Sequence, residues 1–151
     1  MPDQKEISAY LNEAKHVILA TVDAQNKPVL RTMGSFAADG LTVYCSTHRG
    51  TDKLTHIQKN PAVIAYFQHE GQNPAAFKNV SVAGKAVALE TEADIQYAVR
   101  VLSDHLPRFK ERADKGEIAH TVFLRIEAQE VKIVDFSKGK GPQAVEILRV
   151  N

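Results

Sequence analysis

The chain has little of several residue types that define common protein classes. Cys45 is its only cysteine, so an intrachain disulfide and a cysteine-rich metal site are both excluded. Lysines and arginines number 19 against 18 aspartates and glutamates, and the net charge is only +1. This near balance argues against the strongly basic surface of a nucleic-acid-binding protein. Any site for an anion must therefore be local.

Long hydrophobic runs are also missing. The longest, Val17 to Ala20 and Ala62 to Phe67, are too short to cross a bilayer, and the first residues lack the apolar segment of a signal peptide. We therefore expect no membrane partner and a cytoplasmic location, whose reducing conditions fit a single cysteine. The eight glycines form no GxGxxG or P-loop pattern, which argues against a Rossmann dinucleotide site.

The histidines show no spacing that indicates a zinc site. They stand at positions 16, 48, 56, 69, 105 and 120, so none are paired four residues apart on a helix. We expect most of them to be surface or structural residues. Cys45 alternates with Val43 and Thr47, which favours a buried apolar role over a nucleophilic one.

The sequence is rich in segments with the period-two pattern of β-strands. These segments cover residues 17–23, 28–37, 41–47, 62–68, 79–90, 121–128 and 131–136. Short turns join the first three, which predicts an antiparallel meander. Gly84 inside the fifth segment suggests a bulge or a close approach to another group. Residues 137–142 are typical of a mobile loop.

Helical patterns are fewer. We expect helices over residues 3–14, 51–59 and 107–115, and one that begins at Thr91 and includes Leu102. Together the elements predict one domain over residues 1–151, mainly β with added helices: a small antiparallel barrel of six to seven strands with helices packed outside it. The edges of the meander need covering, and a second subunit is one way to cover them.

Three neighbouring features predict a phosphate site. Arg31 lies in the middle of a strand, the third strand ends in Ser46 and Thr47, and a helix then begins at Thr51 with Lys53 in its first turn. The N-terminus of a helix presents free N–H groups and partial positive charge, which suit a phosphate. Each residue also has an ordinary structural interpretation, as a helix cap, a solvated lysine or a structural ion pair. Together they favour a phosphate-bearing ligand.

The order and spacing of several segments resemble one known family. The segments are residues 18–23, 28–33, 44–47, 51–53 and 60–61. They are similar to the pyridoxamine 5′-phosphate oxidase-like FMN-binding split barrels, and the bacterial general stress protein type is the closest subgroup. The similarity is good from His16 to Glu90. It implies a split β-barrel that binds FMN at the interface of a homodimer.

The resemblance also implies roles for particular residues. Residues 31–34 would lie along the flavin ring and the ribityl chain, with positive charge from Arg31. Ser46 and Thr47 would contact the ribityl–phosphate arm, and Thr51 and Lys53 would contact the phosphate. Asn79 takes the place of a glutamine that contacts the cofactor. The implied cofactor-binding residues, in that order, are Arg31, Thr32, Met33 and Gly34; Ser46 and Thr47; Thr51 and Lys53; and Asn79.

The sequence departs from the true oxidases at three places. Asp52 stands where they often carry an arginine, and it should weaken phosphate binding unless His48 or Arg49 compensates. Phe36 stands where they carry a lysine that grips the substrate phosphate. Residues 144–148 lack their aromatic-plus-arginine pattern. We therefore do not expect a vitamin B6 oxidase.

Two functions remain open at this point, beside the alternative of a structural domain that binds no ligand. The first is an FMN-dependent oxidoreductase with a small-molecule redox substrate, for which no catalytic side chain is nominated because the flavin carries the chemistry. The second is a non-catalytic module that binds or senses flavin, a deazaflavin or haem. A haem would need a histidine ligand, and His48 and His120 are the candidates.

Overall fold

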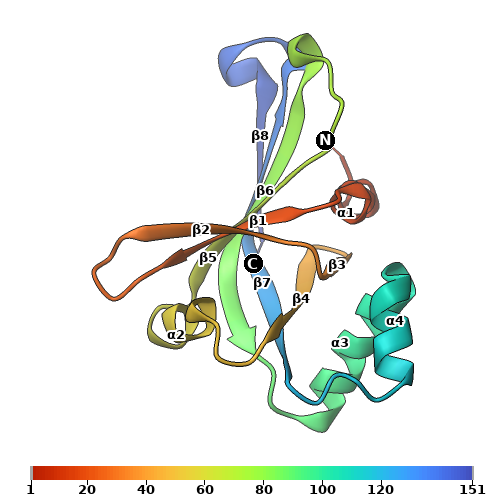
Figure 1. Cartoon of the computed structure of the whole chain (residues 1–151). Helices are drawn as coiled ribbons and strands as arrows, with labels where there is room; N and C mark the ends of the chain where they lie inside the picture. Colours follow the sequence, from red (N-terminus) through yellow and green to blue (C-terminus); the bar gives the residue numbers. More distant parts are fainter. Residues whose placement is uncertain (1, 151) are drawn as a thin grey trace.

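The computed structural model describes residues 2–150 (Figure 1). Its strands are β1 Val17–Val22, β2 Pro28–Met33, β3 Phe36–Asp39, β4 Thr42–His48, β5 Ala62–Gln68, β6 Lys78–Ala88, β7 Thr121–Asp135 and β8 Val145–Arg149. Its α-helices are α1 Gln4–Glu13, α2 Asp52–Lys59, α3 Glu92–His105 and α4 Pro107–Asp114. No helix among residues 2–150 combines the length and the apolar character that a bilayer crossing requires.

The strands form one antiparallel sheet that curls into a half-barrel, which confirms the predicted mainly-β split barrel with peripheral helices. Within the described residues the sheet has eight strands, in the order β2-β1-β5-β6-β7-β4-β3, with β8 paired to β7. Strands β2 and β3 follow each other in the chain but lie at opposite ends of this order. Residues 34 and 35 therefore bridge the two ends of the sheet.

The expectation of one strand over residues 28–37, and of a three-stranded meander, is wrong. Strand β2 pairs with β1, whereas β3 pairs with β4, so the segment belongs to two separate hairpins. The burial pattern gives the reason: Met33 and Phe36 both point into the core, and this spacing of three residues breaks the alternation of a strand. Gly34 and Ser35 form the connection between them.

The two strands predicted over residues 121–136 are one strand, β7. It pairs with β6 along its length, and the register shifts next to Gly84, where Ala83 lies opposite Glu130 and Gly84 opposite Ala128. The extra residue, Gln129, makes a bulge, so the break in the pattern marks a bulge and not a turn. The bulge that Gly84 suggested is confirmed.

The C-terminal part is more regular than expected. Residues 137–142, predicted as a loop, contribute to two short 3₁₀ turns, Phe136–Lys138 and Gly141–Ala144. The carboxylate of Asp135 accepts hydrogen bonds from the amide and the hydroxyl of Ser137, at 3.0 and 2.6 Å. Strand β8, which was not predicted, follows and pairs with β7.

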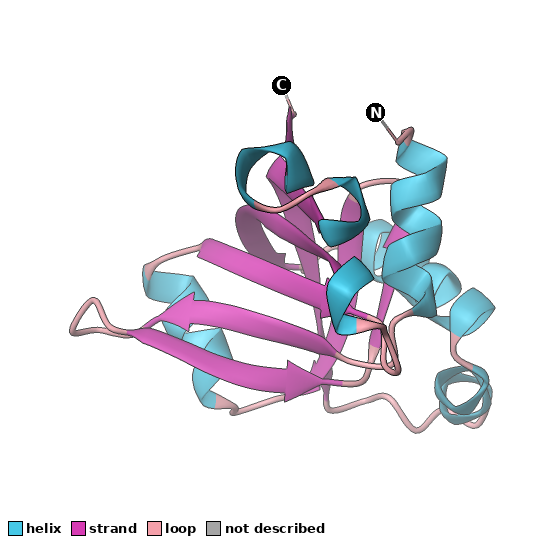
Figure 2. Cartoon of the chain, turned by 90° about the horizontal axis from the view of Figure 1, so that it is seen from above, coloured by secondary structure: helices cyan, strands magenta, loops and turns pink. Residues whose placement is uncertain are grey.

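Helix α1 begins as predicted, with Asp3 as its cap: its carboxylate accepts a hydrogen bond from the Glu6 amide at 2.8 Å. Helix α1 packs on β3, where the side chain of Asn12 both donates to the carbonyl of Ala38 and accepts from its amide, at 3.0 and 2.8 Å. Helix α2 packs against β1 and β6. The helices thus lie around the outside of the sheet, as Figure 2 shows.

Two hydrophobic clusters hold the molecule together. The larger fills the concave side of the sheet and includes Leu19, Phe67 and Leu124. The smaller packs α3 and α4 against the outer faces of β3, β4 and β7; its members are Ala37, Tyr44, Leu89, Ala98, Val101, Leu102, Phe109 and Phe123. Strand β4 is consequently buried on both faces where these helices cover it, and its last residues lead to the site described next.

Candidate functional site

A cavity of about 260 Å³ lies where β4 ends and α2 begins. Its walls come from the end of β2, the connection to β3, the end of β4, the first turn of α2, and the facing parts of α4 and β7. The lining residues are Thr32, Met33, Gly34, Ser35, Ser46, Thr47, His48, Lys53, Arg112 and Thr121. Of the nine predicted site residues, the structure brings six to this cavity: Thr32, Met33, Gly34, Ser46, Thr47 and Lys53.

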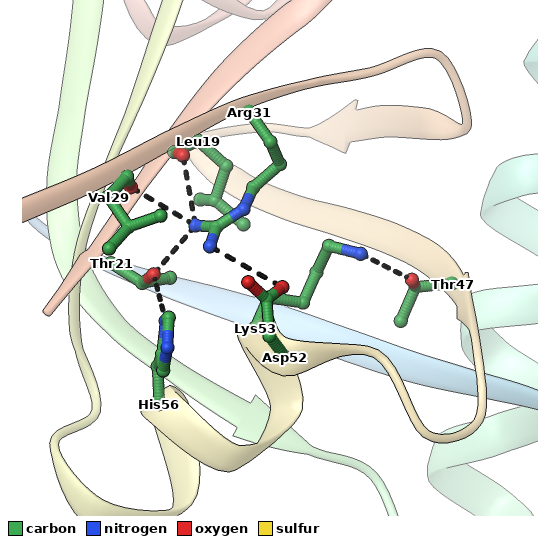
Figure 3. Close-up of polar contacts among 8 residues, drawn as sticks. All are labelled: Leu19, Thr21, Val29, Arg31, Thr47, Asp52, Lys53 and His56. Carbon is green, nitrogen blue, oxygen red and sulfur yellow. Dashed lines mark hydrogen bonds and ion pairs between the residues drawn. The ribbon is translucent and has the colours of Figure 1, made fainter. Parts of the chain in front are cut away.

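Lys53 is the central cation of the cavity. Only 9% of it is exposed, and its ammonium donates a hydrogen bond to the hydroxyl of Thr47 at 2.8 Å, as Figure 3 shows. Burial lowers the pKa of Lys53 from its ordinary value, the nearby charge of Arg31 lowers it further, and Asp52 opposes both effects. A buried ammonium with one neutral partner suits an anionic ligand, which would supply the missing countercharge.

Thr51 is the N-cap residue of α2, as predicted, but its side chain forms no capping hydrogen bond. Its hydroxyl is buried and has no hydrogen-bond partner among the described residues. Buried hydroxyls are seldom left unpaired, because the lost hydration is costly. Thr51 is not among the residues that line the cavity. It is two residues from Lys53, and its free hydroxyl is consistent with a ligand at this helix start.

Arg31 lies beside the cavity but does not line it. Its guanidinium donates to the Leu19 carbonyl of β1 at 3.3 Å, which ties β2 to β1, and to the Val29 carbonyl of its own strand at 3.2 Å. Its other terminal nitrogen lies 3.7 Å from the carboxylate of Asp52, as the dashed line in Figure 3 marks. Burial lowers the pKa of Arg31, and Asp52 partly offsets that effect. The carboxylate of Asp52, expected to oppose a phosphate, thus pairs with this arginine.

A hydroxyl relay that the sequence did not indicate supports Arg31. The guanidinium donates to the Thr21 hydroxyl at 2.6 Å, and that hydroxyl lies 2.8 Å from Nδ1 of His56 (Figure 3). Since a guanidinium can only donate, the Thr21 oxygen accepts from Arg31, and the same hydroxyl shares a second hydrogen bond with Nδ1 of His56. His56, expected to be structural, positions the arginine through Thr21.

We expect Thr21→Val to lower the free energy of unfolding by about 1–3 kcal/mol, because it leaves Nδ1 of the half-buried His56 without its hydrogen-bond partner and removes one bond from Arg31. Urea unfolding of the purified chain measures this change. Thr55→Val, an exposed position on α2, is the matched control and should have little effect. Equal stability of the two variants would contradict the role of the relay.

Four cavity residues were absent from the predicted set. Ser35 hydrogen-bonds to Ser46 through its hydroxyl, and His48 lies opposite Thr121 in the pairing of β4 with β7. His48 was the histidine expected next to the anion site. Arg112 comes from α4, far along the chain, and no local pattern could place it beside Lys53. Arg112 and His48 thus add a guanidinium and an imidazole to the lining of the cavity.

The remaining predicted residue, Asn79, lies elsewhere on the sheet. It is half-buried on β6, opposite Gln68 of β5 and Val134 of β7, and it is not among the cavity residues. Its role toward a cofactor remains a prediction. Cys45 is buried as expected, and burial raises the pKa of its thiol to about 12. That pKa argues against a thiolate nucleophile.

The family model described as pyridoxamine 5′-phosphate oxidase matches residues 3–135, which is most of the chain. The chain belongs to this oxidase family. General stress protein 26 of Bacillus subtilis (strain 168) is 30% identical over 146 residues, which cover 95% of this chain and 96% of that protein. This similarity confirms the resemblance to the general stress protein type.

Solved structures of the same fold also match. A conserved hypothetical protein from Mycobacterium tuberculosis has a TM-score of 0.75 and 20% identity, covering 94% of this chain and 90% of that one. A heme binding protein from Mycobacterium smegmatis has a TM-score of 0.74 and 16% identity, covering 99% of this chain and 59% of that one. At these identities the matches show the shared fold.

The structure explains one departure of this member of the pyridoxamine 5′-phosphate oxidase family. Phe36, which stands where the true oxidases carry a substrate-binding lysine, is 4% exposed and packs edge-on against Phe67, with ring centroids 5.6 Å apart. Its side chain is part of the core and cannot reach a ligand. Residues 144–148, which lack the oxidase pattern, comprise the end of the last 3₁₀ turn and most of β8.

Proposed function

We propose that the protein binds FMN by its phosphate in the cavity at the start of α2 and works as a flavin-dependent oxidoreductase, distinct from a vitamin B6 oxidase. One observation carries this proposal: a buried lysine, Lys53, is hydrogen-bonded to Thr47 within a cavity lined by further hydroxyls. Phosphate oxygens accept hydrogen bonds from both kinds of donor, and a charged donor strengthens them.

The residues that line the cavity fit FMN. Lys53 and Arg112 would bind the phosphate, and the hydroxyls of Ser46 and Thr47 would hydrogen-bond along the ribityl–phosphate arm. Gly34 leaves open space, since a Cβ placed on it would meet nothing within 4 Å, so a flat ring can approach the backbone there. When bound, FMN would supply the electron transfer between a small-molecule donor and an acceptor. The chain's own residues hold and orient it.

A homodimer is part of this proposal. At about 260 Å³ the cavity is smaller than the roughly 300–1,000 Å³ typical of ligand pockets. Part of the cofactor would therefore extend beyond this chain. Strand β2 ends the sheet, and apolar side chains are exposed near it: Leu30 is 67% exposed and Ile64 46%. A second copy packed on this surface would cover both the strand edge and the flavin.

FMN titration with riboflavin as the matched ligand tests the proposal. We expect FMN to bind with one molecule per chain and more than about 100-fold more tightly than riboflavin, because riboflavin lacks the phosphate. Quenching of flavin fluorescence measures both affinities, and size-exclusion chromatography with light scattering measures the oligomer. The loaded protein should oxidise a reduced nicotinamide with a dye or quinone acceptor. Equal affinity for the two flavins would refute the phosphate site.

Haem is the second candidate ligand, and the position of His48 at the cavity favours it. A similar fold occurs in the heme binding protein from Mycobacterium smegmatis, and an imidazole is a common axial ligand of haem iron. A Soret band in the protein as purified would support haem. His48→Ala would then remove the band, whereas FMN binding through Lys53 would not need this histidine.

A further inference from the structure

A second, larger cavity adjoins the cofactor cavity at the corner between α3 and α4. Its volume is about 620 Å³, and three of its residues, Gly34, Ser35 and Arg112, also line the first cavity. A molecule in this second cavity would therefore lie directly beside a ligand in the first. The remaining lining residues are Leu106, Pro107, Arg108 and Phe109.

The walls of the second cavity combine an apolar surface with positive charge. Leu106, Pro107 and Phe109 supply the apolar part, and no acidic residue is among the lining. Arg108 and Arg112 are four residues apart on α4, so they lie on the same face of the helix. The cavity therefore suits a ligand with an apolar body and an anionic end.

The two arginines have no countercharge of their own. Among residues 2–150, no carboxylate forms an ion pair with Arg108 or Arg112. Glu111 and Asp114, the acidic residues of α4, pair with the lysines Lys115 and Lys110 at 2.9 and 2.8 Å. Like charges four residues apart destabilise a helix, and a cation in the first turn opposes the helix dipole. The position of Arg108 near the helix start and near Arg112 is therefore electrostatically unfavourable.

We propose that this second cavity binds the reaction partner of the flavin, and that this partner is an organic anion: an aromatic or aliphatic molecule whose carboxylate or phosphate is bound by Arg108 and Arg112. The inference rests on the proposed function, because it places this molecule beside the cofactor. Arg112 would contact both ligands, whereas Arg108 would contact only the organic anion.

Calorimetric titration of the FMN-loaded protein with benzoate, phenyl phosphate and benzyl alcohol tests the inference. We expect both anions to bind more tightly than the alcohol. Arg108→Gln should lower the affinity for both anions about tenfold, because it removes a charged hydrogen bond. Lys110→Gln removes the same charge from the same helix outside the cavity, and it should leave all three affinities within about twofold. The anion whose affinity falls more in Arg108→Gln identifies the end group, carboxylate or phosphate, that the cavity prefers.

The outcomes separate this inference from the proposed function. FMN affinity should be unchanged in Arg108→Gln and reduced in Arg112→Gln. Anion binding that is insensitive to Arg108, or that falls equally in Lys110→Gln, would overturn the inference while leaving FMN binding intact. If the chain failed to bind FMN but still bound benzoate through Arg108, the cavity assignment would stand and the flavin proposal would fall. Thermal unfolding of each variant verifies that it is folded.

Discussion

Replacement of Lys53 by methionine is expected to lower the affinity for FMN by about 100-fold, the effect of losing a charged hydrogen bond in a buried site. The same variant should leave the cofactor-free protein at least as stable as the wild type. The reason is that the buried ammonium carries a desolvation cost and faces the charge of Arg31, while its one hydrogen bond is to a neutral hydroxyl. Methionine has similar length and no charge.

Fluorescence titration with FMN and thermal unfolding without it measure the two parts of this prediction. Lys59→Met is the control, since it removes an exposed lysine from the last turn of the same helix. It should bind FMN as the wild type does. A Lys53→Met protein that keeps full affinity would show that the phosphate lies elsewhere. One that loses affinity only because it unfolds would be recognised by its lower melting temperature.

The affinity for FMN should also depend on pH in a defined direction. The pKa of Lys53 lies below its ordinary value in the free protein, and a bound phosphate would stabilise the charged ammonium and raise that pKa. Affinity should therefore fall as pH rises through the pKa of the free protein, where the ammonium loses its proton. Lys53→Met should abolish this fall.

Gly84→Ala is expected to destabilise the fold by about 3 kcal/mol, at the upper end of the usual cost of overpacking a core. A Cβ at Gly84 would lie 2.0 Å from the carbonyl oxygen of Glu127 and 2.8 Å from its carbonyl carbon. Both atoms belong to the backbone of β7, a central strand that is paired on both sides and cannot shift alone. The added methyl group would force β6 and β7 apart at the bulge.

Chemical denaturation of Gly84→Ala beside Gly34→Ala measures this effect. Gly34 is the matched control because a Cβ there meets nothing within 4 Å, and its φ is not in the left-handed region. Gly34→Ala should therefore be neutral or slightly stabilising. Equal midpoints for the two variants would show that β7 can move away from Gly84.

The local parts of the site could be predicted from sequence because they rest on short-range patterns. Ser46 and Thr47 lie near the end of β4, and Lys53 follows in the first turn of the next helix, so only one connection is needed to bring them together. The contribution of Arg112 could not be predicted, because helix α4 is placed at the cavity by its packing on α3 and by the contact of Phe109 with Phe123 of β7. Long-range packing of this kind leaves no local pattern.

The errors in strand prediction have a similar cause. Residues 28–37 read as one strand because alternation alone cannot reveal that β2 and β3 pair with different partners. Residues 121–136 read as two strands because a bulge at Gln129 interrupts the pattern in the same way as a turn. In both cases the pairing with another strand decides where a strand ends, and the alternation of a single segment does not record that pairing.

The bridge at Gly34 and Ser35 has a consequence for how the protein assembles. Because β2 and β3 stand at opposite ends of the strand order, these two residues can take their places only after the strands between them have found their partners. Those pairings include β1 with β5 and β4 with β7, which join segments far apart in the chain and therefore form slowly. The ligand-binding residues around the bridge should therefore be the last to become ordered and the first to exchange their amide protons. A bound cofactor would join the two ends of the sheet and slow that exchange.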